Sequence, residues 1–398
     1  HLFIAVFSFQ FMRLRIIIIN LNSLKRPINN SYKLPRLNKL FLLLLFQLVA
    51  VGQEHKKAKG AESNTYSEFS KLPNTQFVFI KKNKLIEKSI VKDGVVSREL
   101  AHNAFETNYH PAESSFNNVK KIAALSDIHG QYDLLVELLI NNKIIDVDLN
   151  WNFGEGHLVI VGDIFDRGDK VNQILWLVYK LEIQAKNKGG HLHFLLGNHE
   201  YMVLQKDLRY IHKKEKLAAQ LLDLDYDALY NNKTVLGRWL RSKSTIIRIN
   251  DIIFTHGGVS EEFIMNNGVD LNEINALMRE QIDTPKKRMK AAPESYGLYY
   301  GPKSLIWYRG YFKEYYEYYQ DHLTEGKIDN ILNLLNSNQI VIGHTSNDEV
   351  VQLYNNKIFC VDSSMKKGKY GEILFIENKQ FFKGKLDGTT SKIIPLAE

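Results

Sequence analysis

Short apolar runs alternate with helical patterns and polar loops through the middle of the chain. The runs KIAALS (121–126), HLVIVG (157–162) and HLHFLLG (191–197) have the length and the apolar content of buried strands. Between them, Leu134–Ile140 and Val171–Leu181 carry apolar residues at helical spacing. This order predicts an α/β layout in which polar loops follow the carboxyl ends of the strands.

Strand-like segments flank this region on both sides. Gln76–Ile80 and Leu85–Val91 predict an early β-hairpin or meander. Tyr201–Arg241 lacks proline and predicts a helical cap, and Thr245–Phe254 predicts a hairpin turning at Asn250-Asp251. Two further helices are expected at Leu271–Ile282 and Ile328–Leu335, and short strands follow Gln339. A strand-rich C-terminal third after an α/β half predicts two packed sheets with helices outside.

The N-terminal part has a different composition. Basic residues within 33–39 precede the apolar run Leu40–Val51, which is typical of a secretory signal peptide and short for a membrane span. We therefore expect a leader at 1–52, part of which could be an over-extended reading frame, a polar linker at 53–75 and one domain at 76–398. This predicts a secreted or periplasmic protein with no stable membrane span after cleavage; the alternative is an uncleaved N-terminal anchor.

Charge and cysteine content exclude several classes. The formal net charge is +8, but residues 1–52 hold seven basic and no acidic residues, so the remainder carries about +1. A basic leader is poor evidence for nucleic-acid binding, and no nucleic-acid partner is expected. The single cysteine, Cys360, excludes a disulfide framework and a cysteine-based zinc site. Its strand-like surroundings predict a small buried apolar side chain.

Five polar clusters follow or interrupt the β-rich runs, each beside glycine or another small residue. They are Asp127/His129, Asp163/Asp166/Arg167, Asn198/His199, His256 with Gly257-Gly258, and His344 with Gly343 and Thr345. Each cluster alone is typical of an ordinary polar turn. Together they predict one site of metal-ligand and acid/base side chains at the ends of strands.

The motifs SDIHG, GDIFDRG, GNHE, HGG and GHT resemble those of the phosphoprotein phosphatase branch of the calcineurin-like metallophosphoesterases. They cover Asp127–Thr345. GNHEYM, LGRWLRS (236–242) and WYRGYF (307–312) are similar to the bacterial, Shewanella-like phosphatases. Ser126 stands where the common pattern has glycine, and we expect only a modest backbone adjustment there. The resemblance implies a four-layer αββα sandwich, two mixed sheets flanked by helices, with a helical cap insertion.

The resemblance also implies two metal ions bridged by Asp163. Asp127 and His129 would hold the first ion, and Asn198, His256 and His344 the second. Oxygen and imidazole ligands suit Mn, Fe or Zn without selecting one. The ions would neutralise a phosphate ester and activate hydroxide for direct in-line attack, with no phosphoenzyme.

Other site residues take roles by the same resemblance. His199 matches the general acid and Asp166 its orienting partner. Arg167 and Arg309 would bind phosphate oxygens, as would the ligand Asn198. Arg309 has an alternative interpretation as a surface arginine beside a buried tryptophan.

The implied reaction is hydrolysis of a phosphomonoester on a phosphorylated peptide, protein or small molecule, with Ser/Thr or Tyr preference open. An aromatic run at Tyr311–Tyr319 is typical of packing, or alternatively of a rim that holds a phosphotyrosine ring. Two other functions stay open: a nucleotide or diadenosine-polyphosphate hydrolase, and a metal-stabilised binding protein without catalysis.

Overall fold

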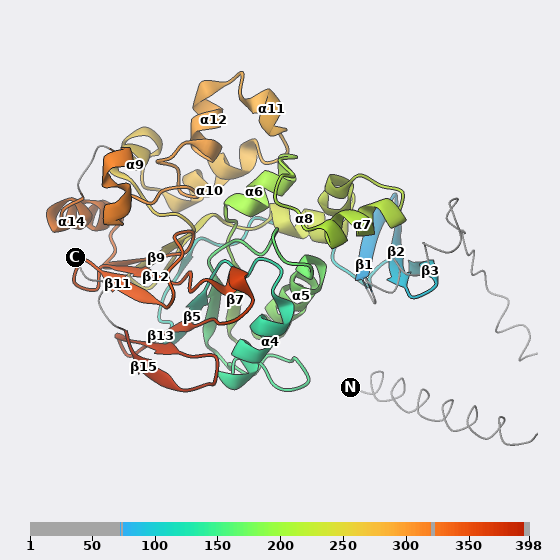
Figure 1. Cartoon of the computed structure of the whole chain (residues 1–398), viewed down its shortest axis with the longest axis horizontal. Coiled ribbons are helices and arrows are strands. Elements are labelled where there is room, and N and C mark those ends of the chain that lie inside the picture. The colour runs from blue at the N-terminus through green and yellow to red at the C-terminus, as the bar shows by residue number, and fades with distance from the viewer. Residues whose placement is uncertain (1–71, 73–74, 320–322, 394–398) are drawn as a thin grey trace, which may run out of the picture. The chain divides into compact units, whose positions relative to one another are not determined.

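The structure is a computed structural model that describes Leu72, residues 75–319 and residues 323–393 (Figure 1). The expected leader and nearly all of the expected linker lie outside these residues, so both stay predictions. Within the described ranges, no helix is both long and apolar enough to cross a membrane. The first strand begins at Thr75, one residue before the predicted start of the domain.

One six-stranded mixed sheet has the order β15-β14-β13-β5-β6-β7. Its strands are β5 (Lys121–Leu125), β6 (His157–Ile160), β7 (His191–Phe194), β13 (Ile373–Glu377), β14 (Gln380–Gly384) and β15 (Thr390–Lys392). The three central strands of the α/β region, β5, β6 and β7, are parallel, and β13 joins β5 antiparallel. Parallel neighbours bring the loops that follow β5, β6 and β7 to the same edge of the sheet.

A second six-stranded mixed sheet has the order β11-β12-β10-β9-β8-β4. Its strands are β4 (Ser115–Phe116), β8 (Ile246–Ile249), β9 (Ile252–Thr255), β10 (Gln339–Ile342), β11 (Val351–Leu353) and β12 (Ile358–Cys360). The predicted hairpin is confirmed: β8 and β9 pair antiparallel, and Asn250 turns the chain with a φ of +56°.

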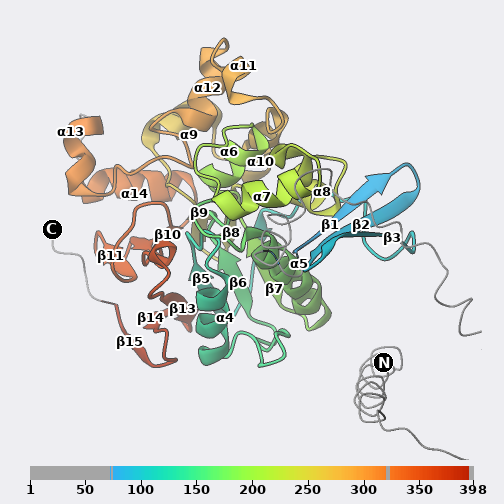
Figure 2. The same ribbon diagram turned by 45° about the vertical axis from the view of Figure 1, so that its right-hand side comes forward.

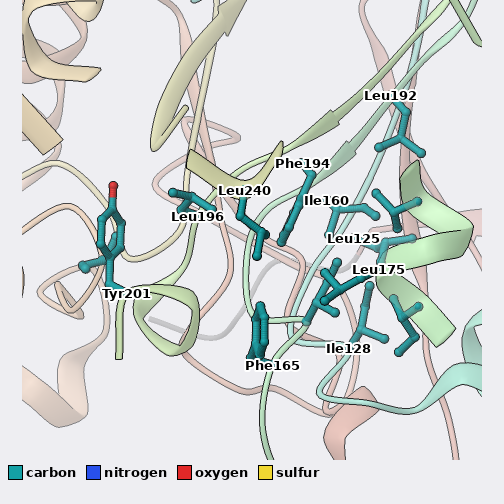
Figure 3. Packing of buried hydrophobic residues seen from close by; sticks show 14 of the residues in the cluster. Leu125, Ile128, Ile160, Phe165, Leu175, Leu192, Phe194, Leu196, Tyr201 and Leu240 are labelled. Carbon is teal, nitrogen blue, oxygen red and sulfur yellow. The ribbon is translucent and has the colours of Figure 1, made fainter. Parts of the chain in front are cut away.

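The two sheets pack face to face. Ile122 and Ala124 of β5 lie in one apolar cluster with Phe254 of β9 and Val341 of β10. The alternate residues of β5, such as Leu125, point to the other face and pack against helices. Figure 3 shows this outer face, where Leu125, Ile160, Leu192 and Phe194 meet Leu175. Alternation along each strand thus supplies both the central and the outer core.

Helices cover both outer faces, which confirms the predicted αββα sandwich. Buried leucine and isoleucine side chains of α4 (Tyr132–Asn141) and α5 (Val171–Asn187) pack on the β5–β7 sheet. On the other sheet, Asn275 of α10 (Leu271–Glu280) binds the backbone at Thr245 and Ile246, and α14 (Glu325–Leu334) adds buried isoleucines. Figures 1 and 2 show these layers around the two sheets.

The predicted cap is helical, as expected. It consists of α6 (Asn198–Leu204), α7 (Lys213–Leu221), the 3₁₀ turn η1 (Tyr226–Tyr230) and α8 (Val235–Arg241). Shorter helices complete the fold: α9 (Glu261–Asn267), α11 (Lys286–Met289), α12 (Pro293–Tyr300), η2 (Lys313–Tyr315), α13 (Tyr316–Tyr319) and η3 (Met365–Lys367).

The early meander is a separate antiparallel sheet beside α8 (Figure 2). Its strands are β1 (Thr75–Lys81), β2 (Lys84–Val91) and β3 (Gly94–Leu100). The first two strands were predicted from the sequence, whereas β3, whose residues are all half-buried or exposed, was not. Strand β14 and the edge strand β15 were not predicted either.

Candidate active site

All five polar clusters meet where strands of the two sheets end. Asp163, in the loop after β6, lies at their centre. Its Oδ2 atom is 3.6 Å from His129 Nε2 and 3.2 Å from His256 Nε2. It also lies 3.9 Å from His199 Nε2. His344 joins the same group, since its ligand atom lies within 4.8 Å of those of Asp163 and His256.

The backbone of these loops is strained. Six non-glycine residues have left-handed φ angles between +46° and +71°: Asp127, His129, Asp163, Asp166, Arg167 and His344. Such conformations cost about 1 kcal/mol or more each and cluster at functional sites. The loops also cross closely, because a Cβ atom on Gly162 would lie 2.7 Å from the Cα of Gly197. Only glycine fits this crossing, so the motif glycines serve close approach as well as turning.

Two ligand sets share Asp163. The first contains Asp127, whose Oδ1 lies 3.7 Å from His129 Nε2. In the second, Asn198 Oδ1 lies 2.9 Å from His256 Nε2. The Nδ1 atom of His129 lies 2.7 Å from the Phe165 carbonyl oxygen and that of His256 2.7 Å from that of Val161. Each Nδ1–H therefore donates to a carbonyl, which orients the ring so that Nε2 faces Asp163.

Burial and neighbouring charges shift the pKa values of the clustered side chains. Burial raises the pKa of Asp127 to about 8. Burial alone would lower the pKa of His256, but the charge of Asp163 raises it to about 9. Burial lowers the pKa of His344, and its buried Nε2 has no hydrogen-bond partner among the residues that the structure describes. Convergent carboxylate, amide and imidazole donors with one imidazole nitrogen unsatisfied are the chemistry that divalent transition metals bind.

His199 and Asp166 form an acid pair at the rim of this cluster. Nδ1 of His199 donates to Asp166 Oδ2 at 2.6 Å, which turns Nε2 toward the centre. Burial lowers the pKa of His199, but Asp163 and Asp166 raise it above its ordinary value. The arrangement therefore keeps a proton on His199 at the position where a general acid must donate it.

The two arginines have different neighbours. A guanidinium nitrogen of Arg167 lies 3.5 Å from His199 Nε2. Arg309 lies near His344, whose pKa its charge lowers in addition to the effect of burial. The Arg309 guanidinium lies 5.5 Å from the centre of the Tyr315 ring. The role of Arg309 in binding phosphate stays a prediction, as does the alternative of a surface arginine beside a buried tryptophan.

Glu200 has a role that the sequence analysis did not assign. Its buried carboxylate accepts hydrogen bonds from the backbone N–H groups of Asp163, Ile164, Phe165 and Gly197. It therefore clamps the loop after β6 to the start of α6. The position of Glu200 in the GNHE motif, beside His199, was the feature of the sequence that could have indicated this role.

Ser126 does more than replace a glycine. Its hydroxyl donates to Asp127 Oδ2 at 2.8 Å, and the backbone N–H of His344 donates to the same oxygen at 2.8 Å. The other oxygen, Oδ1, is the one that lies toward His129. Ser126 thus orients a proposed metal ligand, which a purely conformational interpretation of this position would miss.

The aromatic run serves packing. Tyr311 and Phe312 are 1% exposed and Tyr319 is 9% exposed, which confirms the packing interpretation for them. Cys360 is buried, as predicted, and its thiol donates to the Thr345 carbonyl at 3.1 Å. Burial raises the pKa of this thiol, so it has the character of a structural cysteine.

The chain belongs to the calcineurin-like phosphoesterases, whose family pattern matches residues 120–360 and includes all five clusters. It is therefore a hydrolase of phosphoric esters that uses divalent metal ions.

Within this family it is similar to the Shewanella-like protein phosphatases. The solved cold-active protein-tyrosine phosphatase of a psychrophilic Shewanella species is 40% identical, with a TM-score of 0.73, covering 80% of this chain and 98% of that one. Shewanella-like protein phosphatase 1 of Plasmodium berghei is 26% identical over 334 residues, 82% of each chain. A symmetrical bis(5'-nucleosyl)-tetraphosphatase of Legionella pneumophila is 27% identical over 187 residues, 46% of this chain and 58% of that one.

Proposed function

We propose that this protein is a protein phosphatase that hydrolyses phosphomonoesters on phosphorylated side chains and holds two metal ions. The observation that carries the proposal is the position of Asp163, which lies between two ligand sets and beside the His199–Asp166 pair. The names of the Shewanella and Plasmodium relatives support a phosphorylated protein as substrate.

The proposed ligands follow the two sets around Asp163. The first ion would be held by Asp127, His129 and Asp163, and the second by Asp163, Asn198, His256 and His344. When bound, the ions would supply positive charge that neutralises the phosphate ester and would lower the pKa of water for in-line attack.

The protein's own groups complete the reaction. Nε2 of His199 would give its proton to the leaving oxygen, while Asp166 holds Nδ1 and the ring orientation. Arg167, beside His199, and Arg309, whose charge acts on His344, would bind phosphoryl oxygens. The leaving group must then lie next to His199.

The acid assignment is tested with two aryl phosphates that differ in leaving group. For His199→Ala, kcat on phenyl phosphate should fall by roughly 10²–10⁴-fold, and less on p-nitrophenyl phosphate, whose leaving group needs protonation less. His191→Ala is the matched control, because His191 opens β7 at the end of that strand away from the ligands. Near wild-type kcat of His199→Ala on phenyl phosphate would exclude His199 as the acid.

A substrate panel tests the proposed protein substrate. The metal-loaded enzyme is given phosphotyrosine and phosphoserine peptides, and diadenosine tetraphosphate in parallel. Hydrolysis of a phosphopeptide is expected. Hydrolysis of the dinucleotide alone would favour the nucleotide hydrolase, and metal binding without any hydrolysis would favour the binding protein.

A further inference from the structure

Tyr210 is an exposed aromatic residue beside the proposed acid. Its ring centre lies 5.4 Å from that of His199, at an interplanar angle of 48°. Tyr210 is 43% exposed, whereas His199 is 3% exposed. An exposed tyrosine ring therefore lies in direct contact with the buried acid.

The loop that carries Tyr210, between α6 and α7, is anchored on both sides. The backbone N–H of Arg167 donates to the Tyr210 carbonyl at 3.1 Å, which joins this loop to the loop after β6. Asp207 accepts from Arg209 Nε and from Lys286 Nζ, both at 2.7 Å. These bonds fix the backbone on which the ring stands.

Two guanidinium groups flank the ring. Those of Arg167 and Arg209 lie 5.5 Å and 5.3 Å from its centre, within cation–π range. Such contacts favour one orientation of the tyrosine ring. Tyr210 is thus a fixed surface rather than a freely rotating side chain.

The reaction places the leaving group against this surface. The leaving oxygen must lie within hydrogen-bond distance of His199 Nε2, and whatever it carries extends outward from there. Tyr210, whose ring centre lies 5.4 Å from that of His199, is an aromatic side chain against which a phenyl ring on that oxygen can pack when it extends toward this side of the acid. The short alkyl group of phosphoserine has no ring and cannot form an aromatic contact with Tyr210.

We propose that Tyr210 is a specificity-determining residue, which forms the wall against which an aryl leaving group packs. The site accordingly selects aryl phosphomonoesters, such as phosphotyrosine side chains, over alkyl ones. This inference rests on the proposed phosphatase function. It differs from the aromatic-rim interpretation of Tyr311–Tyr319, whose most exposed member, Tyr318, packs its ring against Tyr319 at 5.0 Å.

The test compares Tyr210→Ala with Tyr210→Phe on two peptides that differ only in phosphotyrosine or phosphoserine, and on phenyl phosphate and glycerol phosphate. For Tyr210→Ala, KM on the two aryl substrates should rise about tenfold, the size of one aromatic contact with its buried area. Its kcat, and its KM on the alkyl substrates, should stay within about twofold. Tyr210→Phe and Tyr318→Ala should behave as wild type.

Several results would overturn the proposal. These are equal KM changes on aryl and alkyl substrates, an unchanged aryl KM, or the same selective loss in Tyr318→Ala. If Tyr210→Ala fails to fold, Tyr210→Leu keeps apolar bulk without a π face and gives the same comparison. If wild type hydrolyses phenyl phosphate but neither peptide, the proposal of a phosphorylated protein as substrate is wrong. The role of Tyr210 is then tested by comparing KM on phenyl phosphate with KM on glycerol phosphate.

Discussion

Replacing Glu200 with glutamine should loosen the active-site loops without changing their ligands. Oε1 of Glu200 accepts from the backbone N–H groups of Ile164 at 2.7 Å and Phe165 at 3.2 Å. Oε2 accepts from those of Asp163 at 2.8 Å and Gly197 at 2.7 Å. A glutamine has one acceptor oxygen, so its NH₂ group must face two of these donors in either orientation. Two buried N–H groups are then unsatisfied, which costs about 2–6 kcal/mol in total.

This cost should lower both the free energy of unfolding and the affinity for metal. A domain is typically stable by only about 5–15 kcal/mol, so the free energy of unfolding should fall measurably. Either orientation of the amide disturbs the loop that carries Asp163. We therefore expect metal affinity to fall at least about tenfold, as when other groups that orient ligands are removed.

The assay is urea unfolding and calorimetric metal titration of wild type and Glu200→Gln at pH 8.5. Burial, with the charge of Asp163, raises the pKa of Glu200 to about 7, so at this pH the carboxylate is ionised and accepts all four bonds. Glu377→Gln is the control, because its ion pair with Lys121, at 3.2 Å, is exposed and worth less than about 1 kcal/mol. If Glu200→Gln is no less stable than Glu377→Gln and binds metal like wild type, the clamp does not exist.

Three further predictions concern single contacts. Asp166→Asn should lower kcat on phenyl phosphate by roughly 10²-fold or more, since His199 loses its orienting charge; unchanged kcat would contradict the pairing. Ser126→Ala should weaken metal binding about tenfold in calorimetric titration, because Asp127 loses one of two donors to Oδ2; wild-type affinity would show the hydroxyl to be dispensable. Burial raises the pKa of Glu215 from its ordinary 4.5 to about 8, so wild type should lose stability as the pH rises from about 4.5 through 8. Glu215→Gln should lose less stability than wild type between pH 5.5 and 8.5 in urea unfolding, because only the loss from the other raised carboxyl pKa values, such as that of Glu200, remains; equal losses in the two proteins would refute the burial argument.

The ligands of the site were predictable because each lies in a short motif directly after a strand. Asp127, Asp163 and Asn198 follow three parallel strands, whose carboxyl ends meet by geometry at one edge of the sheet. His256 and His344 follow β9 and β10, which are parallel neighbours in the second sheet. Face-to-face packing of the two sheets then brings the two groups of loops together. Residues separated by more than two hundred positions thus become neighbours because each follows a strand, and the strands are recognisable in the sequence.

Other features were not predictable, because they depend on partners rather than on local pattern. β3 is polar along much of its length, and β14 contains lysine and glycine; pairing with a neighbouring strand holds both in place. Tyr210 lies in a cap loop without any motif. Its position beside His199 follows from the anchoring of that loop by Arg167 and Asp207. No spacing along the chain could have indicated it.

Six non-glycine residues of the site have left-handed backbone conformations, and the convergence of the ligands is the cause. Ligands that converge on a point from separate strands require the chain to reverse abruptly, which drives non-glycine residues such as Asp163 and His344 into left-handed conformations. Those conformations persist only where surrounding bonds over-determine them. Here the carboxylate of Glu200 and the backbone bonds from the loop after β5 to Gly162, Asp163 and Ile164 do so. The hydrogen bonds of Glu200 and the left-handed conformations therefore depend on each other. The two sheets hold the ends of the loops, so the loops keep the ligands in positions that an isolated loop would not maintain.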